Sequence, residues 1–237
     1  MTYRAIEQFV LHKCNVKAEC RHPWLRRMVW EGMERLAGWT EGAPTIHVLI
    51  EERPMSRLDR HLKLERKLIL DKGSICEEAT VLSEGRSHLI VRIGERATVV
   101  INYPELCINI RVHDLSWMLR YYDPLYSSSV FFQSLLLELL PEQGILPLHA
   151  SMCALDQHGI VICGPPKTGK THLNCALIAH GAKFMADEIG FVLEGPDHKQ
   201  RLGAFPIRAK IHPSDAELME TAGFMLVARG YGGMLIA

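Results

Sequence analysis

The chain has 237 residues, and its 27 basic and 27 acidic side chains give a formal net charge of zero. With 48% hydrophobic and 23% charged residues it has the composition of a globular protein, which excludes a disordered chain of low hydrophobicity and high net charge. The balanced charge also argues against a nucleic-acid partner and against a polybasic membrane anchor.

Seven cysteines are scattered along the chain without a CxxC pair, which argues against a disulfide framework or a zinc ribbon. Cys107 and Cys163 stand within apolar runs, so we expect them to be reduced core residues. The first residues lack the apolar stretch of a signal peptide, and no apolar run reaches the roughly 20 residues of a membrane span. These features predict a cytoplasmic protein without a membrane partner.

Residues 1–144 predict an N-terminal α+β region. Residues 24–38 have the apolar periodicity of a helix. Short β-branched segments separated by Gly, Asn, Pro or charged residues then indicate a meander of antiparallel strands. Two further helices are predicted over 116–122 and 128–140, and Pro141 ends the second one. The six predicted strands of the meander span residues 46–50, 67–70, 79–82, 88–93, 97–101 and 107–112.

Residues 145–237 have a different order of elements, and we expect them to form a second domain. A glycine-bearing loop stands between a buried strand and a helix that Gly181 ends as its C-terminal cap. A later helix has Ser214 as its predicted N-cap and stops at Gly223. The predicted elements are strands 146–155 and 159–163, loop 164–169, helix 170–180, strands 182–186 and 189–193, extended segment 205–208 and helix 214–222.

The loop and the start of its helix match the phosphate-binding pattern GxxxxGK[ST]. Gly164 and Gly169 allow the backbone to turn so that successive N–H groups face phosphate oxygens, and the following helix N-terminus adds to that field. Lys170 is predicted to contact the β- and γ-phosphates, and the Thr171 hydroxyl to reach Mg²⁺. A strand before the motif and a helix after it provide the context that the motif requires.

Two other loop residues, Lys167 and Thr168, also belong to the predicted nucleotide site. Lys167 stands where many such loops carry glycine, and a positive φ there would cost a lysine roughly 1 kcal/mol or more. The Lys167 side chain either adds positive charge to the phosphates or points to solvent from the loop rim.

Neither Ser151 nor Thr168 lies in a Gly-x-Ser-x-Gly elbow, so neither is predicted to be a nucleophile.

An acidic pair, Asp187 and Glu188, ends the strand after the loop helix, and Asp187 lies 17 residues after Lys170. A helix of about 10 residues spans about 15 Å, and a return strand of five or six residues covers a similar distance. We therefore expect both carboxylates near the loop, where they suit Mg²⁺ coordination and deprotonation of an acceptor.

Three motifs together resemble the HPr serine kinase/phosphorylase family and its HPr-kinase-like relatives: Leu148-His149, the phosphate loop, and the Gly181–Glu188 segment. The resemblance covers about residues 145–193. It implies a phosphoenolpyruvate carboxykinase-like nucleotide-binding core, a mixed sheet with a phosphate loop. The fold class expected for the whole chain is therefore α/β (α+β), with this core preceded by a mostly antiparallel β region with helices.

The resemblance also implies roles for single residues. Lys170 would bind nucleotide phosphates, Asp187 would take the proton from the acceptor hydroxyl, and His149 would match an active-site histidine. Thr171 and Glu188 would hold the metal, although the family usually has Asp at the second position. Relatives often place basic residues near the phosphates where this chain has Arg208 and Lys210, and a solvated basic edge is the alternative there.

These features predict a cytoplasmic kinase that uses ATP and Mg²⁺ to phosphorylate a serine or other hydroxyl of a small protein or peptide, a ribosomal peptide precursor being one candidate. A small-molecule kinase and a nucleotide-binding regulatory module with little turnover stay open, as do phosphorolysis and a homo-oligomeric state. The glycine-rich Glu-x-Arg-Gly-x-Gly signature of the bifunctional enzymes is not found. The apolar ending 232–237 favours a core that is truncated or short at its C-terminal end.

Overall fold

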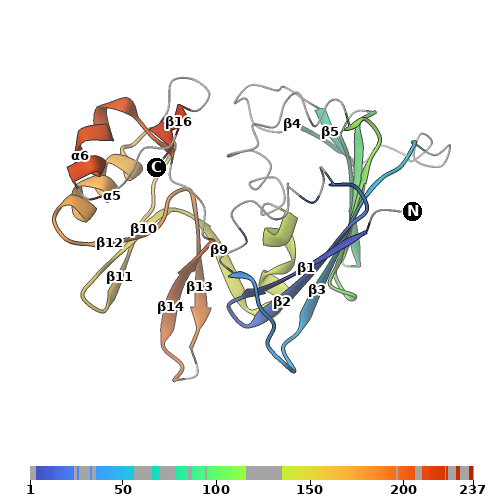
Figure 1. The fold of residues 1–237 in the computed structure, drawn as a ribbon, viewed down its shortest axis with the longest axis horizontal. Coiled ribbons are helices and arrows are strands. Elements are labelled where there is room, and N and C mark those ends of the chain that lie inside the picture. Colours follow the sequence, from blue (N-terminus) through green and yellow to red (C-terminus); the bar gives the residue numbers. More distant parts are fainter. Residues whose placement is uncertain are drawn as a thin grey trace. The chain divides into compact units, whose positions relative to one another are not determined.

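The computed structural model divides the chain into two compact units, Met1–Leu139 and Leu140–Ala237 (Figure 1). Both units consist mostly of strands, and the described part of the chain is a mixed α/β fold with few helices. None of the described helices has the length and apolar character needed to cross a lipid bilayer. The structure describes residues 4–23, 26, 33, 36–55, 66–69, 78–84, 87–93, 95–115, 135–195, 197–205, 210–221, 223, 228–229 and 235–236.

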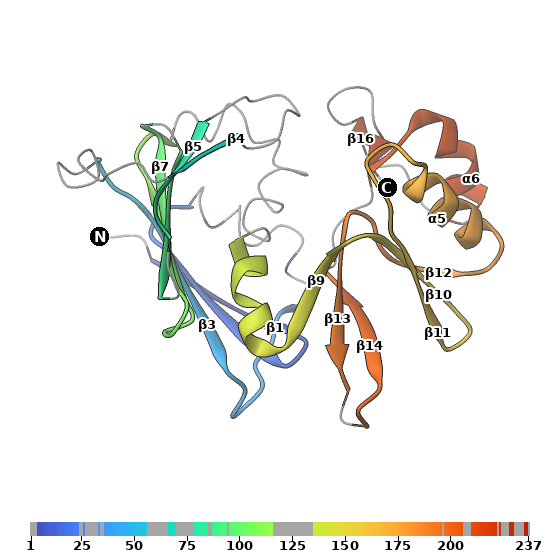
Figure 2. The ribbon, with the colours of Figure 1, turned by 180° about the vertical axis from the view of Figure 1, so that it is seen from behind.

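The first unit contains one eight-stranded mixed sheet, with strand order β1-β2-β3-β8-β7-β6-β5-β4 (Figure 2). Its alternating inner-face residues are fully or almost fully buried, among them Phe9, Val16, Ile50 and Ile110. This alternation is what a sheet with one buried face requires. The strands are β1 (Ala5–Leu11), β2 (Cys14–Cys20), β3 (Thr45–Glu52), β4 (Arg66–Ile69), β5 (Glu78–Glu84), β6 (His88–Ile93), β7 (Ala97–Asn102) and β8 (Cys107–Val112).

The predicted meander is confirmed for β4 to β8, which pair in succession and antiparallel. For β3 the prediction is wrong, because this strand pairs in parallel with both β2 and β8. Parallel neighbours need a long crossover, and residues 21–44 between β2 and β3 provide that length. The hairpin of β1 and β2 was not predicted, since its turn at His12 and Lys13 contains neither Gly nor Pro.

The helices predicted for the first unit lie largely outside the described residues. Of the segment 24–38 only a few positions are described, and residues 116–122 are not described at all. Residues 135–139 are helical, which agrees with the C-terminal part of the predicted 128–140 helix. A short 3-10 helix, η2 (Pro141–Gln143), follows in the second unit.

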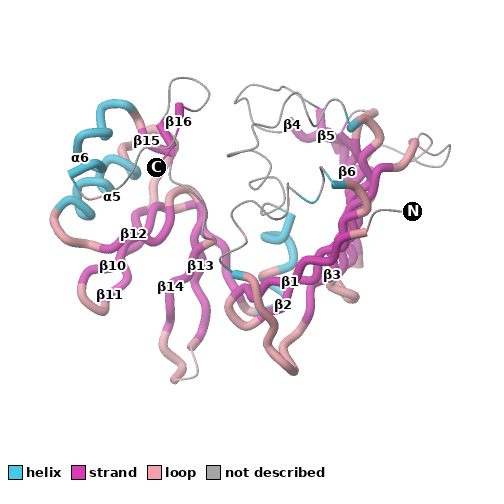
Figure 3. Tube along the Cα trace, viewed as in Figure 1, coloured by secondary structure: helices cyan, strands magenta, loops and turns pink. Residues whose placement is uncertain are grey.

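The second unit contains two three-stranded sheets of order β11-β10-β12 and β14-β13-β9, and a small third sheet of order β15-β17-β16 (Figure 3). Its strands are β9 (Ile145–His149), β10 (Ser151–Leu155), β11 (His158–Ile162), β12 (Lys183–Ala186), β13 (Ile189–Glu194), β14 (Gln200–Ala204), β15 (Lys210–Ile211), β16 (Ala228–Arg229) and β17 (Leu235–Ile236). Its helices are α5 (Lys170–Ala179), the 3-10 helix η3 (Pro213–Asp215) and α6 (Ala216–Thr221).

The predicted strand 146–155 is in fact two strands in two different sheets. β9 pairs with β13, whereas β10 pairs with β11 and β12. The chain changes sheets at the buried Ala150, whose N–H donates to the carbonyl of Glu188 at 3.1 Å. Continuous hydrophobic character along 146–155 could not reveal this break, because both strands are apolar.

The sheet β11-β10-β12 contacts α5 on one face and residues of the other sheet on its opposite face. Cys153 of β10 packs against Ile178 of α5. On the opposite face, a Cβ on Gly190 of β13 would lie 2.2 Å from the sulfur of Met152. Glycine is therefore required where β13 approaches β10, and this close approach brings the two sheets of the unit together.

The predicted helix ends are confirmed at two glycines. Gly181 and Gly223 have φ values of 101° and 85°, and each follows the end of its helix. The N-cap prediction is wrong at Ser214, because the ring nitrogen Nδ1 of His212 accepts from the Ser214 N–H and η3 precedes α6. Cys163 is also a correction: its side chain is exposed in the loop after β11, where the apolar run predicted burial.

Candidate functional site

Residues 163–169, here called the 163–169 loop, join β11 to α5. Gly169 is the N-cap of α5 with φ 87°, and Lys167 has φ 64°, the left-handed conformation that is costly for a lysine. The Thr168 hydroxyl donates to the carbonyl of Pro165 at 2.8 Å. The loop thus places a strained non-glycine residue just before a helix N-terminus, a position where strain often accompanies function.

The Lys170 ammonium turns back onto this loop. Its Nζ donates to the carbonyls of Gly164 at 3.0 Å and Pro165 at 3.1 Å. Both partners are exposed neutral acceptors, so an anionic ligand could replace them without leaving a buried charge unpaired. The ammonium therefore stands beside the backbone that would surround a phosphate.

Asp187 lies beside the start of α5, as the spacing of helix and return strand predicted. The Thr171 hydroxyl donates to Asp187 Oδ1 at 3.0 Å, and the Ser151 hydroxyl donates to the same oxygen at 2.7 Å. These three side chains come from α5, from β10 and from the residue that follows β12. Asp187 is only 7% exposed, so it is a buried carboxyl group held by two hydroxyls.

Burial raises the pKa of Asp187 above its ordinary value, because desolvation disfavours the charged carboxylate. The hydrogen bonds from Ser151 and Thr171 and the charge of Lys170 lower the pKa, and the charge of Glu188 raises it. The net effect is a raised pKa, which makes this carboxylate a better proton acceptor than an exposed aspartate.

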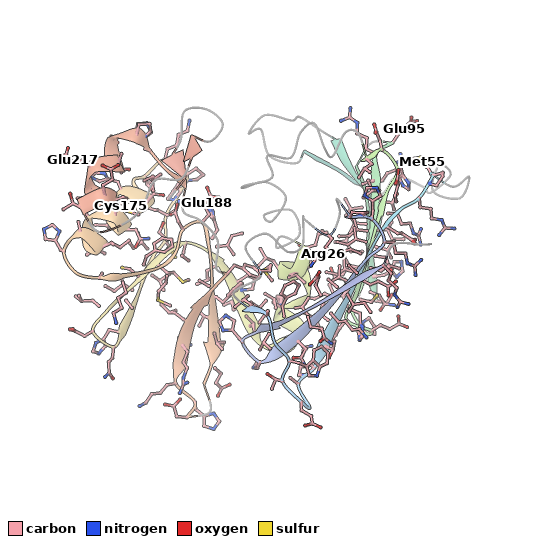
Figure 4. The ribbon with its side chains drawn as sticks, in the orientation of Figure 1. Arg26, Met55, Glu95, Cys175, Glu188 and Glu217 are labelled. Atoms are coloured by element: carbon pink, nitrogen blue, oxygen red, sulfur yellow. The ribbon has the colours of Figure 1, made fainter. Side chains whose placement is uncertain are left out.

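Glu188 forms the turn between β12 and β13, and Figure 4 labels it there, in the same unit as Cys175 of α5. Its side chain is exposed and its φ is 75°. Its carbonyl accepts from the N–H of Ala150, so the strained turn is anchored at the point where the chain changes sheets. It follows Asp187 directly in the chain, and its charge raises the pKa of Asp187.

His149 ends β9 and pairs with Ile189 of β13, so it lies next to the turn that carries Glu188. Its side chain is exposed. The hydrogen-bond partners described for the Asp187 carboxylate are Ser151 and Thr171, and a contact between His149 and Asp187 is not among them. The role suggested for His149 therefore stays a prediction.

The predicted basic residues of the site fall outside what the structure describes. Arg208 lies in the undescribed segment 206–209, and for Lys210 only the backbone, at the start of β15, is described. Their suggested contacts with phosphate stay predictions.

Sequence reasoning missed three polar side chains around the site. Ser151 lies in no Gly-x-Ser-x-Gly elbow, so the sequence predicts no role for it, although its place two residues after His149 could mark it as a partner of Asp187. Asn174 is 2% exposed, and its position four residues after Lys170 puts it one helical turn further along α5. His172 Nδ1 lies 2.5 Å from Oδ1 of the buried Asp215, a pair that ties α5 to η3.

The oxygen atoms of this site fit a magnesium ion. Thr171 offers a hydroxyl and Glu188 a carboxylate, and the Asp187 carboxylate lies beside Thr171. Within the described residues there is no group of three or more His, Cys, Asp or Glu side chains placed to hold a metal by themselves. Mg²⁺ usually binds through one or two carboxylates together with water and substrate phosphates, so this donor set suits it.

A scan against protein-family models and a search of curated proteins find no match for this chain. The functional assignment therefore depends on the residues and geometry described above.

Proposed function

We propose that the Leu140–Ala237 unit is an HPr-kinase-like phosphotransferase that uses ATP and Mg²⁺ to phosphorylate a hydroxyl group. The observation that carries the proposal is the convergence of Thr171 and Ser151 on the Asp187 carboxylate at the N-terminus of α5. It supports the proposal because a buried carboxyl group, chemically able to act as a base, lies beside the motif that would bind nucleotide phosphates.

In this proposal the 163–169 loop and the N-terminus of α5 bind the phosphates through backbone N–H groups. Lys170 exchanges the carbonyls of Gly164 and Pro165 for phosphate oxygens. Mg²⁺, held by Thr171 with Glu188 nearby, would neutralise charge on the β- and γ-phosphates.

Asp187 would accept the proton of the acceptor hydroxyl while the oxygen of that hydroxyl bonds to the γ-phosphorus of ATP. The bond between the γ-phosphorus and the oxygen that leaves with ADP breaks in the same step. The products are the phosphorylated acceptor and ADP, with the proton left on Asp187. The proposed acceptor is a serine of a small protein or peptide, in a cytoplasmic setting.

Transfer of label from γ-labelled ATP to co-expressed proteins and peptides tests the proposal. Asp187→Asn should lower transfer by about 10²- to 10⁴-fold, the usual contribution of a general base, while ATP binding is kept. Asparagine retains an oxygen that can accept from both Ser151 and Thr171. The matched control is Asp197→Asn at an exposed position of the same unit, which should leave transfer unchanged.

Undiminished transfer by Asp187→Asn would refute the assigned base. ATP binding without transfer to any protein, peptide or small molecule would instead favour a nucleotide-binding regulatory module, and transfer to small molecules alone would favour a small-molecule kinase.

Lys170→Ala tests the phosphate site itself. Because charge-assisted hydrogen bonds contribute about 1.5–3 kcal/mol, the variant should bind ATP about ten- to a hundredfold more weakly. Lys199→Ala, at a lysine that is 82% exposed and paired with Asp197, is the control and should bind normally. Equal ATP affinity of Lys170→Ala and the unaltered protein, measured by calorimetry, would rule out the loop as the nucleotide site.

A further inference from the structure

The strand that leads to Asp187 is irregular. In the pairing of β10 with β12, Met152 lies opposite Ala186 and Cys153 lies opposite Phe184, so Met185 is an extra residue on β12. This is a β-bulge, which bends a strand and changes the direction of the side chains beyond it.

The packing shows the effect of the bulge on side-chain direction. Phe184 packs toward α5, against Cys153 and Cys175. Met185 and Ala186 both pack in the cluster of Met152 on the opposite face of the sheet. Two successive residues on one face interrupt the alternation of a regular strand.

The next residue, Asp187, therefore returns to the face of α5, where Thr171 and Ser151 donate to it. In a strand without the bulge, strict alternation from Phe184 would put Asp187 on the opposite face. A shift of one residue reverses the face of every following side chain. The bulge is thus the feature that brings the carboxylate to Thr171 at the start of α5.

Asn174 of α5 bonds to both strands at this bulge. Its Nδ2 donates to the carbonyl of Ala186 at 3.2 Å and to that of Met152 at 3.5 Å. Reversing the amide would point its oxygen at two carbonyl oxygens, so the hydrogen bonds fix its orientation. Its own Oδ1 is buried and has no hydrogen-bond partner among the described residues.

A buried acceptor without a partner destabilises a protein, and an apolar residue of the same size would avoid that cost. The hydrogen bonds described for the Asn174 side chain both go to the strands at the bulge. We propose that Asn174 is a positioning residue, whose amide holds the β12 bulge and thereby keeps the Asp187 carboxylate beside Thr171. The importance of this position for turnover rests on the proposed function, whereas the structural role does not.

A mutant cycle on stability tests the structural role without any activity assay. Ser151→Ala removes the hydroxyl that bonds to Asp187, and its effect on the urea unfolding midpoint is measured in three backgrounds: the unaltered protein, Asn174→Leu and Ile178→Ala. Leucine keeps the approximate size of asparagine but has no donor. Ile178 lies one turn further along α5, packs on Cys153 and does not bond to the bulge, so it is the matched control.

In the Asn174→Leu background, Ser151→Ala should shift the urea unfolding midpoint at most about half as far as in the other two backgrounds. Without the Asn174 amide, Asp187 is no longer held in place to accept from Ser151, and the effects of coupled sites are not additive. Equal shifts in all three backgrounds would overturn the proposal. A second measurement needs no variant at position 174. The side-chain amide protons of Asn174 should exchange slowly with solvent, and exchange as fast as that of an exposed asparagine would also overturn it.

Turnover provides a separate readout. Asn174→Leu should lower kcat about ten- to a hundredfold with the KM for ATP nearly unchanged, because misplacing a catalytic group by about 1 Å has an effect of this size. Ile178→Ala should leave kcat nearly unchanged, and an equal loss of kcat in both variants would contradict a positioning role. If the unaltered protein shows no transfer, the proposed function fails, and the stability cycle still decides the role of Asn174.

Discussion

At Asp187, burial and hydrogen bonding act on the carboxyl group in opposite directions. Burial raises the pKa and the hydroxyls of Ser151 and Thr171 lower it, and burial dominates. The folded protein therefore binds this proton more tightly than the unfolded chain does. Stability linked to Asp187 is fully present below the ordinary aspartate pKa, and it is lost as the pH rises through the raised pKa.

Asp187→Asn removes this loss, because asparagine is neutral at every pH. In metal-free buffer the variant should gain stability relative to the unaltered protein as the pH rises above about 4, and the gain should level off above the raised pKa. Urea unfolding at a series of pH values measures the difference. A difference that does not depend on pH, or that grows toward acid pH, would contradict the assigned burial effect.

At Lys167 the backbone has φ 64°, and a side chain in this region costs roughly 1–2 kcal/mol relative to glycine. Lys167→Gly should therefore raise the free energy of unfolding, by up to about 1 kcal/mol after the added entropy of the unfolded chain is subtracted. Lys167→Ala removes the charge but keeps the strain, so it is the control and should not be stabilised. Weaker ATP binding by both variants would show that the charge contacts phosphate, whereas normal binding by both would place the lysine on the solvent side.

At the scale of elements, the second unit is organised around β10. Its residues alternate between the cluster of Met152, which faces β13 and β14, and that of Cys153, which faces α5. Ser151 follows this alternation and shares the face of Cys153, which explains why it meets Asp187. The close contact between Gly190 and Met152 holds the neighbouring sheet against this strand.

Gly190→Ala should destabilise the protein by about 1–3 kcal/mol, the usual effect of extra volume in a packed core. The added Cβ would meet the Met152 sulfur, and Met152 is fully buried, so it has little room to move. Met152→Ala should restore part of this loss when the two changes are combined, and thermal unfolding measures the cycle. Strict additivity of the two changes would show that the contact does not limit the approach of the sheets.

At the scale of the whole molecule, the zero net charge means that a phosphate ligand would be held by a few placed groups rather than by a broad positive field.

The described cysteines differ in exposure and in the pKa of their thiols. Burial raises the pKa of Cys20 in the first unit and of Cys175 in the second unit to about 12, whereas Cys163 is exposed beside Gly164.

Among the described cysteines, iodoacetamide should therefore modify Cys163 first, because the reactive thiolate is scarce at the buried positions. ATP with Mg²⁺ should slow this modification, since phosphates bound by the 163–169 loop would cover the neighbouring thiol. Mass spectrometry of peptides after timed labelling measures both effects. An unchanged rate at saturating ATP would contradict nucleotide binding at this loop.

The sequence by itself determined those strands, helix ends and site residues whose patterns depend only on neighbouring residues. β-branched segments predicted β4 to β8, glycines predicted the ends of α5 and α6, and the spacing from Lys170 predicted that Asp187 lies near the start of α5. These signals are local because strand and helix periodicity, and the reach of a helix and strand, depend only on neighbouring residues. The phosphate-binding motif is of the same kind.

The tertiary structure alone decided which elements meet. The parallel pairing of β3, the change of sheets at Ala150, and the bulge that turns Asp187 toward Ser151 all depend on contacts between residues far apart in the chain. Periodicity assigns each residue to a face but does not name the partner strand or an extra residue such as Met185. The partners of Asp187 therefore emerge only when β10, α5 and β12 are packed together.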